Sequence, residues 1–525
     1  MAPTPPTLDY FKFCPGEEHI KISNAICRGR RRTNFPRCPG CQFNDDEKPG
    51  NAIAPGGRPR DVATIEALFR AHDILGPAPY PLSPDVAWRV GHAAGQYLHG
   101  RLRGLERADP QVRSLVVGRD LRSISRQLQI GLIDGIRSTG IDVINIGAID
   151  TPQLYFAVNY FRACGGIQTT GGRHPAGYSG FRISAAKGFP IGAETGLMSI
   201  RDIALRVPRH DSGSTAGCRE EDLKEPYRDF IRRFLIGGGA LGRPVKIVVD
   251  AARGAASKWW PLIFDDVPEL DVKRLNFDKE GRLARTPDPL DPANTAELRA
   301  AVKDRRADLG VAFDGDASRC VFVDDKGKVV APDIIAALLA RRFIERERGA
   351  SIVLDLRCTR AALEEIDEAG GVCIPSRIGS QLLKKMMLER QAIFGADISG
   401  HYYFRDNFYG ESAFLAVAHV VSLLAETGRS LSNLVRPIVR YRCTGEIGFE
   451  HQDADRLFNE IAAAHADAHV DDLDGLTVRY ADWWFNLRRA EAPPALRLVL
   501  EARSKRLVDQ HLAELSPVLG QRLRC

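Results

Sequence analysis

Two carboxylates and a hydroxyl gather in one short stretch of this 525-residue chain. Asp314, Asp316 and Ser318 alternate with small residues directly after the apolar run at residues 309–313. A hard cation such as Mg²⁺ prefers oxygen ligands, so the two aspartates could hold one, and the neutral Ser318 hydroxyl would make the site weak. The alternative is a solvated acidic turn at the end of a strand.

A glycine-rich stretch at residues 169–175, Thr-Thr-Gly-Gly-Arg-His-Pro, could serve an anion. Backbone N–H groups of Gly171 and Gly172 could form a nest for it, and Thr169 and Thr170 supply hydroxyls. Basic side chains that could meet an anion are Arg173, His174, Arg182, Lys384, Arg488 and Arg497. For each of these, a surface position without a ligand is the competing interpretation.

Clustered cysteines occur only near the amino terminus, at Cys14, Cys27, Cys38 and Cys41. Four thiolates could form a structural Zn²⁺ site that lets a small segment fold without a large core. The first two are separated by 12 residues, which is not a standard ribbon spacing, and His19 is a substitute ligand. Free thiols in a segment without fixed structure are the alternative.

A basic run at residues 28–32 lies beside these cysteines. It could meet an acidic partner, a nucleic acid or another part of the chain. A solvated charged face is the simpler interpretation of so short a run.

The elements that must position these loops follow a repeated pattern. An apolar run that ends in a carboxylate occurs at residues 114–120, 246–250 and 351–355. β-Branched residues on both faces of each run predict buried strands with helices on either side. Helical stretches such as residues 360–366 and further strands such as residues 141–146 complete each unit, so the repeats predict three tandem α/β domains.

From about residue 441 the pattern changes to that of a small α+β domain, with strands expected at residues 477–480 and 496–500. Ligands of open α/β sheets bind at the carboxyl ends of the strands, so we expect the domains to enclose a central cleft. The expected divisions are a Cys-rich basic segment at 1–60, α/β/α domains at 61–207, 208–335 and 336–438, and the α+β domain at 439–525.

Bulk composition narrows the functional classes. Net charge is +6, and residues 1–60 carry ten Lys or Arg against six Asp or Glu, so the remainder is close to neutral. This argues against a nucleic-acid or membrane binder, apart from the basic run at the amino terminus. We find no secretory signal and no apolar stretch of spanning length. Eleven cysteines, mostly scattered, fit reduced thiols and predict a cytoplasmic protein.

Several loops, in order along the chain, resemble those of the α-D-phosphohexomutase family, of the bacterial phosphomannomutase/phosphoglucomutase type. The resemblance covers roughly residues 65–510. It rests on GRDLR at 118–122, GGRHP at 171–175, YSGFR at 178–182, DGDASR at 314–319 and GADISGHYYFRD at 395–406. It implies three phosphoglucomutase-type α/β/α domains and a C-terminal domain around a central cleft. It also implies Mg²⁺ and phosphoryl transfer between C1 and C6 of glucose or mannose phosphate.

The chain departs from this family at the groups that carry the chemistry. In the family's TASHNP loop the third residue is the serine that carries the phosphoryl group, and here it is Gly172, which has no nucleophile. In the family's DGDGDR loop the third aspartate is a magnesium ligand, and here it is Ser318. Thr170 is a substitute hydroxyl, although its different place in the loop would misalign in-line attack.

Further loops that the resemblance assigns to the substrate are also changed. The glutamate of GEMSGH is Asp397, while Ser399 and His401 remain. The family's YDIRG arginine is Leu75. In the phosphate-binding RxSxTEPxxR, Arg488 and Arg497 remain but both hydroxyls are gone and Glu491 adds negative charge.

Two functions stay open from the sequence. One is a degenerate mutase that keeps the scaffold and binds a sugar phosphate, with Mg²⁺ weak or absent. The other is an active hexose-phosphate mutase that uses a displaced nucleophile such as Thr170.

Overall fold

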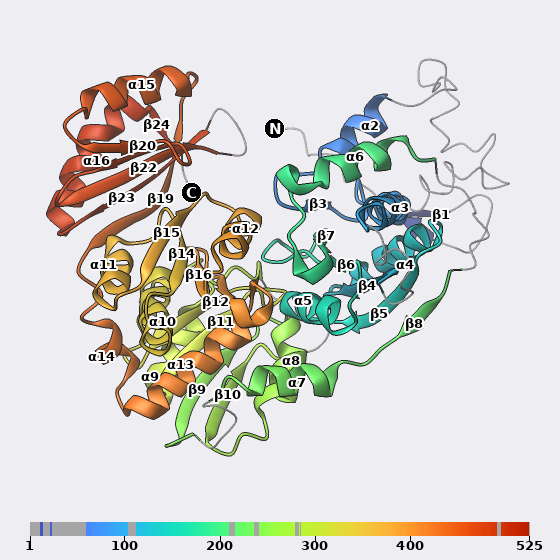
Figure 1. Cartoon of the computed structure of the whole chain (residues 1–525), viewed down its shortest axis with the longest axis horizontal. Coiled ribbons are helices and arrows are strands. Elements are labelled where there is room, and N and C mark those ends of the chain that lie inside the picture. The colour runs from blue at the N-terminus through green and yellow to red at the C-terminus, as the bar shows by residue number, and fades with distance from the viewer. Residues whose placement is uncertain are drawn as a thin grey trace, which may run out of the picture. The chain divides into compact units, whose positions relative to one another are not determined.

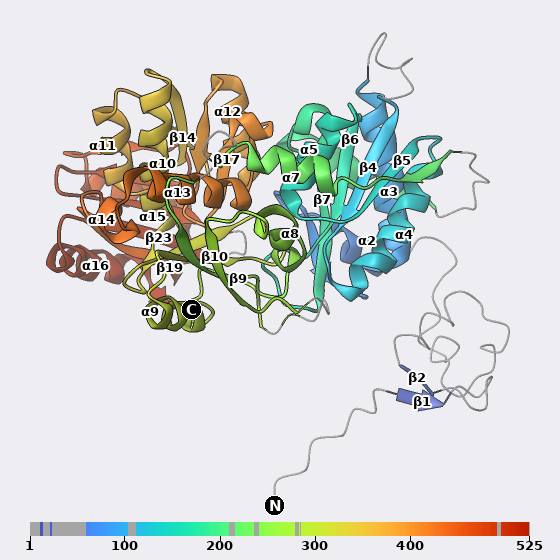
Figure 2. The same ribbon diagram turned by 90° about the horizontal axis from the view of Figure 1, so that it is seen from below.

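The computed structural model describes residues 11–13, 21–23, 59–102, 112–208, 216–235, 241–278, 283, 285–490 and 495–523. The chain divides into two compact units, Met1–Thr64 and Ile65–Cys525. The described part of the first unit holds a short antiparallel pair, β1 (Phe11–Phe13) with β2 (Lys21–Ser23), and the start of α2 (Pro59–Glu66). The second unit contains the three α/β/α domains and the C-terminal sheet-rich domain expected from the sequence (Figures 1 and 2).

Domain I is built on a six-stranded sheet in the order β3-β7-β6-β4-β5-β8. Its strands are β3 (Ile74–Pro77), β4 (Ser114–Arg119), β5 (Asp142–Ala148), β6 (Gly165–Thr169), β7 (Tyr178–Ala185) and β8 (Cys218–Glu220). Its helices are α3 (Pro84–Gly100), α4 (Ser123–Arg137), α5 (Thr151–Tyr160) and α6 (Leu197–Arg206). In β4, Val116 packs in the core with α5, while Leu115 and Val117 pack in the core with α3 and α4. The unbroken apolar run therefore forms a strand covered on both faces.

Domain II repeats this three-layer arrangement with the strand order β10-β9-β11-β12-β13. Its strands are β9 (Val245–Asp250), β10 (Leu270–Leu275), β11 (Leu309–Phe313), β12 (Cys320–Asp324) and β13 (Val329–Val330). Its helices are α7 (Lys224–Arg232), α8 (Ala255–Phe264) and α9 (Ala296–Arg305). Val249 shares a core with α8 and Val248 shares one with α9, so alternate side chains of β9 again serve opposite faces.

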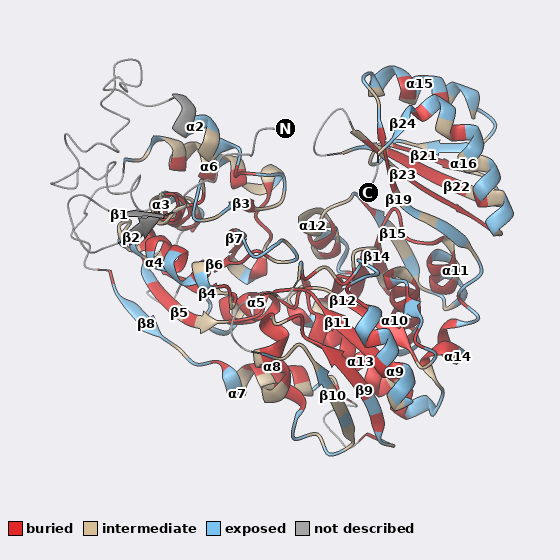
Figure 3. Ribbon diagram, turned by 180° about the vertical axis from the view of Figure 1, so that it is seen from behind, coloured by how far each residue is buried: buried red, intermediate tan, exposed pale blue. Residues whose placement is uncertain are grey.

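Domain III has the order β15-β14-β16-β17-β18. Its strands are β14 (Ser351–Asp355), β15 (Val372–Ser376), β16 (Phe394–Ala396), β17 (Tyr402–Phe404) and β18 (Gly410–Glu411). Its helices are α10 (Pro332–Arg346), α11 (Arg360–Glu368), α12 (Ser380–Arg390), α13 (Ala413–Thr427) and α14 (Leu431–Val435). One continuous buried core joins parts of domains I, II and III, which Figure 3 shows as buried strands and helices.

The C-terminal domain, here domain IV, is a six-stranded sheet in the order β20-β21-β22-β23-β19-β24. Its strands are β19 (Arg442–Glu450), β20 (His469–Asp471), β21 (Leu476–Arg479), β22 (Trp483–Arg489), β23 (Ala495–Ala502) and β24 (Gln521–Arg522). Alternate apolar residues of these strands share a core with α15 (Ala454–Ala464) and α16 (Lys505–Leu519). The other face of the sheet therefore carries its polar side chains.

Candidate functional site

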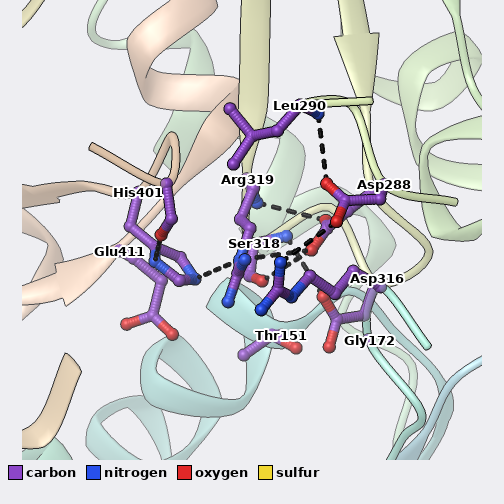
Figure 4. A network of polar contacts seen from close by, with 12 residues as sticks. Thr151, Gly172, Asp288, Leu290, Asp316, Ser318, Arg319, His401 and Glu411 are labelled. Atoms are coloured by element: carbon purple, nitrogen blue, oxygen red, sulfur yellow. Dashed lines mark hydrogen bonds and ion pairs between the residues drawn. The ribbon is translucent and has the colours of Figure 1, made fainter. Parts of the chain in front are cut away.

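The loops that the sequence singled out lie at the ends of strands, as an open α/β sheet requires. The loop after β4 carries Asp120 and Arg122, and the loop after β6 carries Thr170 and Gly172. The β11–β12 loop of domain II meets both: the Thr170 hydroxyl donates to Asp316 Oδ2 at 2.9 Å, and a Cβ at Gly315 would lie 3.4 Å from Arg122 Nη2. Figure 4 shows these loops and that of domain III from close by.

A single buried arginine shapes the loop that follows β6. The guanidinium of Arg122 donates to the carbonyls of Gly172 at 2.8 Å, His174 at 2.7 Å, Pro175 at 2.6 Å and Tyr178 at 3.0 Å. The GRDLR motif of the sequence therefore acts here by folding the neighbouring loop rather than by facing a ligand.

The backbone amides of this loop are also used internally. Gly171 N donates to the Asp120 carboxylate at 3.0 Å, and Gly172 N donates to the Thr170 hydroxyl oxygen at 3.0 Å. The prediction of an anion nest at Gly171 and Gly172 is therefore wrong, because both N–H groups already have protein acceptors.

Gly172 faces the acidic loop of domain II. Its φ of +48° is in the left-handed region, and a Cβ placed there would have a single neighbour within 4 Å, the Asp316 Oδ2 at 3.6 Å. The carbonyl of Gly172 lies so close to Gly315 that a Cβ at residue 315 would be 2.4 Å from it. A side chain at residue 172 would thus point at Asp316, and glycine leaves that position without a reactive atom.

Asp316 is fully buried and surrounded by positive charge and donors. The Thr170 hydroxyl donates to its Oδ2 at 2.9 Å, and Ser318 N lies 3.4 Å from its Oδ1. Burial favours a raised pKa, but nearby Arg182 and the hydrogen bonds outweigh it and lower the pKa of Asp316 to about 2. Asp316 is therefore a carboxylate at neutral pH and a poor proton acceptor.

Asp314 lies beside it in a different state. Burial and the charge of Asp316 raise the pKa of Asp314 to about 8, so this carboxyl group takes up a proton much more readily than Asp316 does. Ser318 Oγ lies 3.2 Å from its Oδ2, and Arg319 N donates to its Oδ1 at 3.1 Å.

These residues offer Mg²⁺ an incomplete cage. Asp314 and Asp316 are the two carboxylates of the loop, and a neutral Ser318 hydroxyl follows them; the hydroxyls of Thr170 and Ser318 already lie within hydrogen-bond distance of these carboxylates. Across the described ranges, no group of three or more His, Cys, Asp or Glu side chains is arranged to hold a metal ion.

The loop between β16 and β17 joins this site through a histidine. Asp397 Oδ1 accepts hydrogen bonds from Ser399 N at 2.9 Å and His401 N at 3.1 Å, and its Oδ2 lies 2.8 Å from His401 Nδ1. Arg319 Nε donates to His401 Nε2 at 3.0 Å, which places the imidazole proton on Nδ1 (Figure 4). Burial lowers the pKa of His401 despite the neighbouring Asp397, so the ring is neutral.

A second buried cluster joins domain III to domain I, and its pairing could not be predicted from the sequence. Glu411 Oε1 accepts hydrogen bonds from Arg182 at 3.0 Å and from the Tyr155 hydroxyl at 2.9 Å. Lys384 Nζ lies 3.6 Å from the centre of the Tyr155 ring and has no hydrogen-bond acceptor among the described residues. Burial lowers the pKa of Lys384 to about 8. Arg182 and Lys384 were predicted from their charge, whereas Tyr155 and Glu411 were missed because only the fold brings them together.

The other predicted basic residues lie in separate contacts. Arg173 pairs with Asp288 of domain II at 3.0 Å. His174 stacks on Tyr178, and burial with nearby arginines lowers the pKa of its ring to about 4. Arg488 and Arg497 of domain IV contact Glu446.

Two predictions remain untested, the zinc site and the partner of the basic run. Cys14, Cys27, Cys38, Cys41 and the basic run at residues 28–32 lie outside the described residues, so the zinc site stays a prediction. No helix within the described ranges is long and apolar enough to cross a bilayer.

Comparison with known families gives a consistent match. Models of the phosphoglucomutase/phosphomannomutase α/β/α domains I, II and III match residues 66–207, 226–327 and 331–441. A phosphomannomutase of Salmonella montevideo is 33% identical over 456 residues, which cover 83% of this chain and 94% of the relative. A protein of Xanthomonas campestris described as phosphohexose mutases is 31% identical over 86% of this chain and 98% of its own length.

A solved structure agrees. The crystal structure of a phosphoglucomutase/phosphomannomutase family protein from Burkholderia thailandensis superimposes with a TM-score of 0.78. It is 27% identical, and the match covers 86% of this chain and 97% of that one. Because the models of domains I, II and III match in order along the chain and relatives above 30% identity cover more than four fifths of it, the chain belongs to the phosphoglucomutase/phosphomannomutase family of α-D-phosphohexomutases.

Proposed function

We propose that this protein is a degenerate hexose-phosphate mutase, which binds a sugar phosphate on the family scaffold without interconverting its 1- and 6-phosphates. The observation that carries the proposal is Gly172, whose missing side chain would be the one that points at Asp316 Oδ2 from 3.6 Å. A phosphoryl group can be held covalently only by a nucleophilic atom, and glycine has none.

Thr170 is the nearest alternative nucleophile, and its surroundings argue against that role. Its hydroxyl donates to Asp316 at 2.9 Å and accepts the Gly172 N–H at 3.0 Å. Activation of a hydroxyl needs a base that takes its proton, and Asp316, with a pKa near 2, is a weak one. An active mutase that uses Thr170 is therefore the less favoured of the two candidate functions.

The family depends in general on magnesium. We assign no step to a metal here, because the acidic loop satisfies its carboxyl groups with Ser318, Thr170 and Arg319 instead of leaving them open. The charge that remains available to a ligand comes from arginine and lysine side chains.

Binding of a sugar phosphate has support from two described regions. Arg488 and Arg497 of domain IV are two guanidinium groups on one sheet face, the geometry that phosphate oxygens prefer. Ser399 and His401 stand in the loop where the family recognises the sugar hydroxyls. The roles of these residues are part of the proposal, and so are Lys384, Asp397, Arg173 and His174 as neighbours of the ligand.

Phosphorus NMR tests the proposal directly. The full chain is incubated with glucose 1-phosphate, Mg²⁺ and a trace of glucose 1,6-bisphosphate, and in parallel with the mannose compounds. We expect no 6-phosphate signal above the protein-free control, and chemical-shift or line-width changes that show binding. A 6-phosphate signal that grows with protein concentration and disappears in EDTA refutes the degenerate mutase and favours the displaced nucleophile.

A cytoplasmic location belongs to the same proposal. The six cysteines within the described part of the chain are all free thiols, as expected in a reducing compartment. A sugar phosphate is the proposed ligand, and we propose no nucleic-acid or membrane partner for the α/β domains.

A further inference from the structure

Three neighbouring strands of domain IV carry a cluster of opposite charges. Arg488 on β22 lies directly opposite Arg497 on β23, and Glu446 is on the adjacent strand β19. Leu496 and Leu498 on either side of Arg497 point into the core with α15 and α16. The cluster therefore lies on the face of the sheet opposite to its helices.

Two arginines directly opposite one another on antiparallel strands repel, so this pair needs an anion. Glu446 supplies it from within the protein. Arg488 Nη2 lies 3.1 Å from both carboxylate oxygens of Glu446, and Arg497 Nε lies 3.5 Å from its Oε1. The Glu446 carboxylate thus stands where two guanidinium groups converge.

Domain III adds a third guanidinium group to the same carboxylate. Arg357, in the loop after β14, donates to Glu446 Oε2 at 2.6 Å and also pairs with Asp355. Arg488 and Arg497 share the single carboxylate of Glu446, which is paired with Arg357 as well. The arginines of domain IV therefore retain attraction for a second anion.

Unused donors lie on the same two arginines. Arg488 Nε is buried without a hydrogen-bond partner among the described residues, while the Arg497 side chain is 37% exposed. Arg497 also lies across Gly448, where a Cβ would come within 2.8 Å of its Nη1. The Arg497 guanidinium thus lies against the backbone of β19 while part of the side chain stays exposed.

We infer that Glu446 is a built-in competitor, which a phosphate dianion displaces from Arg488 and Arg497 while Glu446 stays paired with Arg357. This inference rests on the proposed sugar-phosphate binding. It specifies that Glu446 pairs with the two arginines when no ligand is present. A dianion with three acceptor oxygens satisfies two guanidinium groups better than one carboxylate does. Removing the Glu446 charge also removes repulsion between it and the incoming ligand.

Isothermal titration of the full chain with inorganic phosphate, and separately with glucose 1-phosphate, tests the inference. We expect Glu446→Gln to bind inorganic phosphate at least tenfold more tightly than the unchanged protein. Glu450→Gln, an exposed residue of the same strand, removes the same charge and is expected to leave the affinity within twofold. Adding Arg497→Gln to Glu446→Gln is expected to abolish the gain.

Phosphate binding by Glu446→Gln that is equal to or weaker than that of the unchanged protein overturns the inference, because Glu446 would then support the arginines instead of competing. If Glu446→Gln loses its circular-dichroism spectrum, Glu446→Asp replaces it, with a smaller gain expected from its shorter reach and no gain counting against the inference. The two ligands separate the claims. Tighter phosphate binding with no additional affinity for glucose 1-phosphate keeps the competitor and removes the sugar-phosphate function.

Discussion

Replacement of Gly172 by alanine tests the geometry on which the proposed function depends. The φ of +48° at this residue costs an L-residue about 1–2 kcal/mol, whereas the nearest atom to a new Cβ, Asp316 Oδ2 at 3.6 Å, is at an ordinary contact distance. We therefore expect Gly172→Ala to destabilise the loop by about 1–2 kcal/mol through its backbone alone, with no clash to add to it.

Hydrogen exchange followed by mass spectrometry measures this locally. A peptide that covers residues 169–178 includes the amides of Gly171, which donates to Asp120, and of His174, which donates to the Gly171 carbonyl. A loss of about 1–2 kcal/mol corresponds to exchange that is roughly 5- to 30-fold faster in this peptide. Peptides from β9 and β14, in other domains, are expected to exchange at unchanged rates.

Gly172→Ser is the matched variant. It has the same backbone cost, but its hydroxyl faces Asp316 and can regain about 0.5–1.5 kcal/mol through a hydrogen bond. Exchange in Gly172→Ala that stays within twofold of the unchanged protein would refute the left-handed conformation. Loss of protection throughout domain I would refute the open space beside Asp316. Either result would remove the argument that residue 172 presents its side chain to the acidic loop.

Three further changes address charge in the site. Glu411→Gln is expected to destabilise the protein by about 1.5–3 kcal/mol because Arg182 loses a charge-assisted hydrogen bond and keeps only Asp316 as a nearby buried carboxylate. Tyr155→Phe is expected to cost only about 1 kcal/mol, and shifts in urea unfolding midpoints compare the two. Asp150 is the buried residue that caps the start of α5, and it accepts a hydrogen bond from the Tyr227 hydroxyl at 2.8 Å. Burial raises the pKa of Asp150 to about 7, so the folded state holds a proton that the unfolded state releases above pH 4. Asp150 should therefore lower the stability between pH 4 and pH 7 by up to about 1.4 kcal/mol per unit, and Asp150→Asn should remove this part of the slope; a slope that Asp150→Asn leaves unchanged contradicts the assignment. Ser318→Asp supplies a third carboxylate, so it should bind Mn²⁺ in an electron paramagnetic resonance titration in which the unchanged protein binds none, and equal binding by both would contradict our reading of the acidic loop.

Much of the fold could be predicted from the apolar runs. The strands expected at residues 114–120, 246–250 and 351–355 are β4, β9 and β14, since β-branched residues on both faces suit only a sheet covered on each side. The positions of the loops after these strands could also be predicted, because the carboxylate at the end of each apolar run marks the end of the strand.

The pairing of side chains between domains could not be predicted. Arg182 and Glu411 are 229 residues apart, and no local pattern links them. The loop amides show another limit of the sequence. Two glycines predicted a nest, but Asp120 and Thr170 supply the acceptors, and only the folded loop reveals that these oxygens lie within reach.

The charged side chains of the candidate site are paired with one another inside the protein. This pairing is common to the acidic loop of domain II and the arginines of domain IV. A buried carboxylate needs a proton or a cation beside it, because an unpaired charge in the interior is costly. Burial and Asp316 raise the pKa of Asp314, Asp316 lies near Arg182, and Arg182 is paired in turn with Glu411. In domain IV, Glu446 lies in the same way between arginine side chains. A nucleophile introduced at residue 172 would leave these internal pairs in place, and a ligand would still have to displace them.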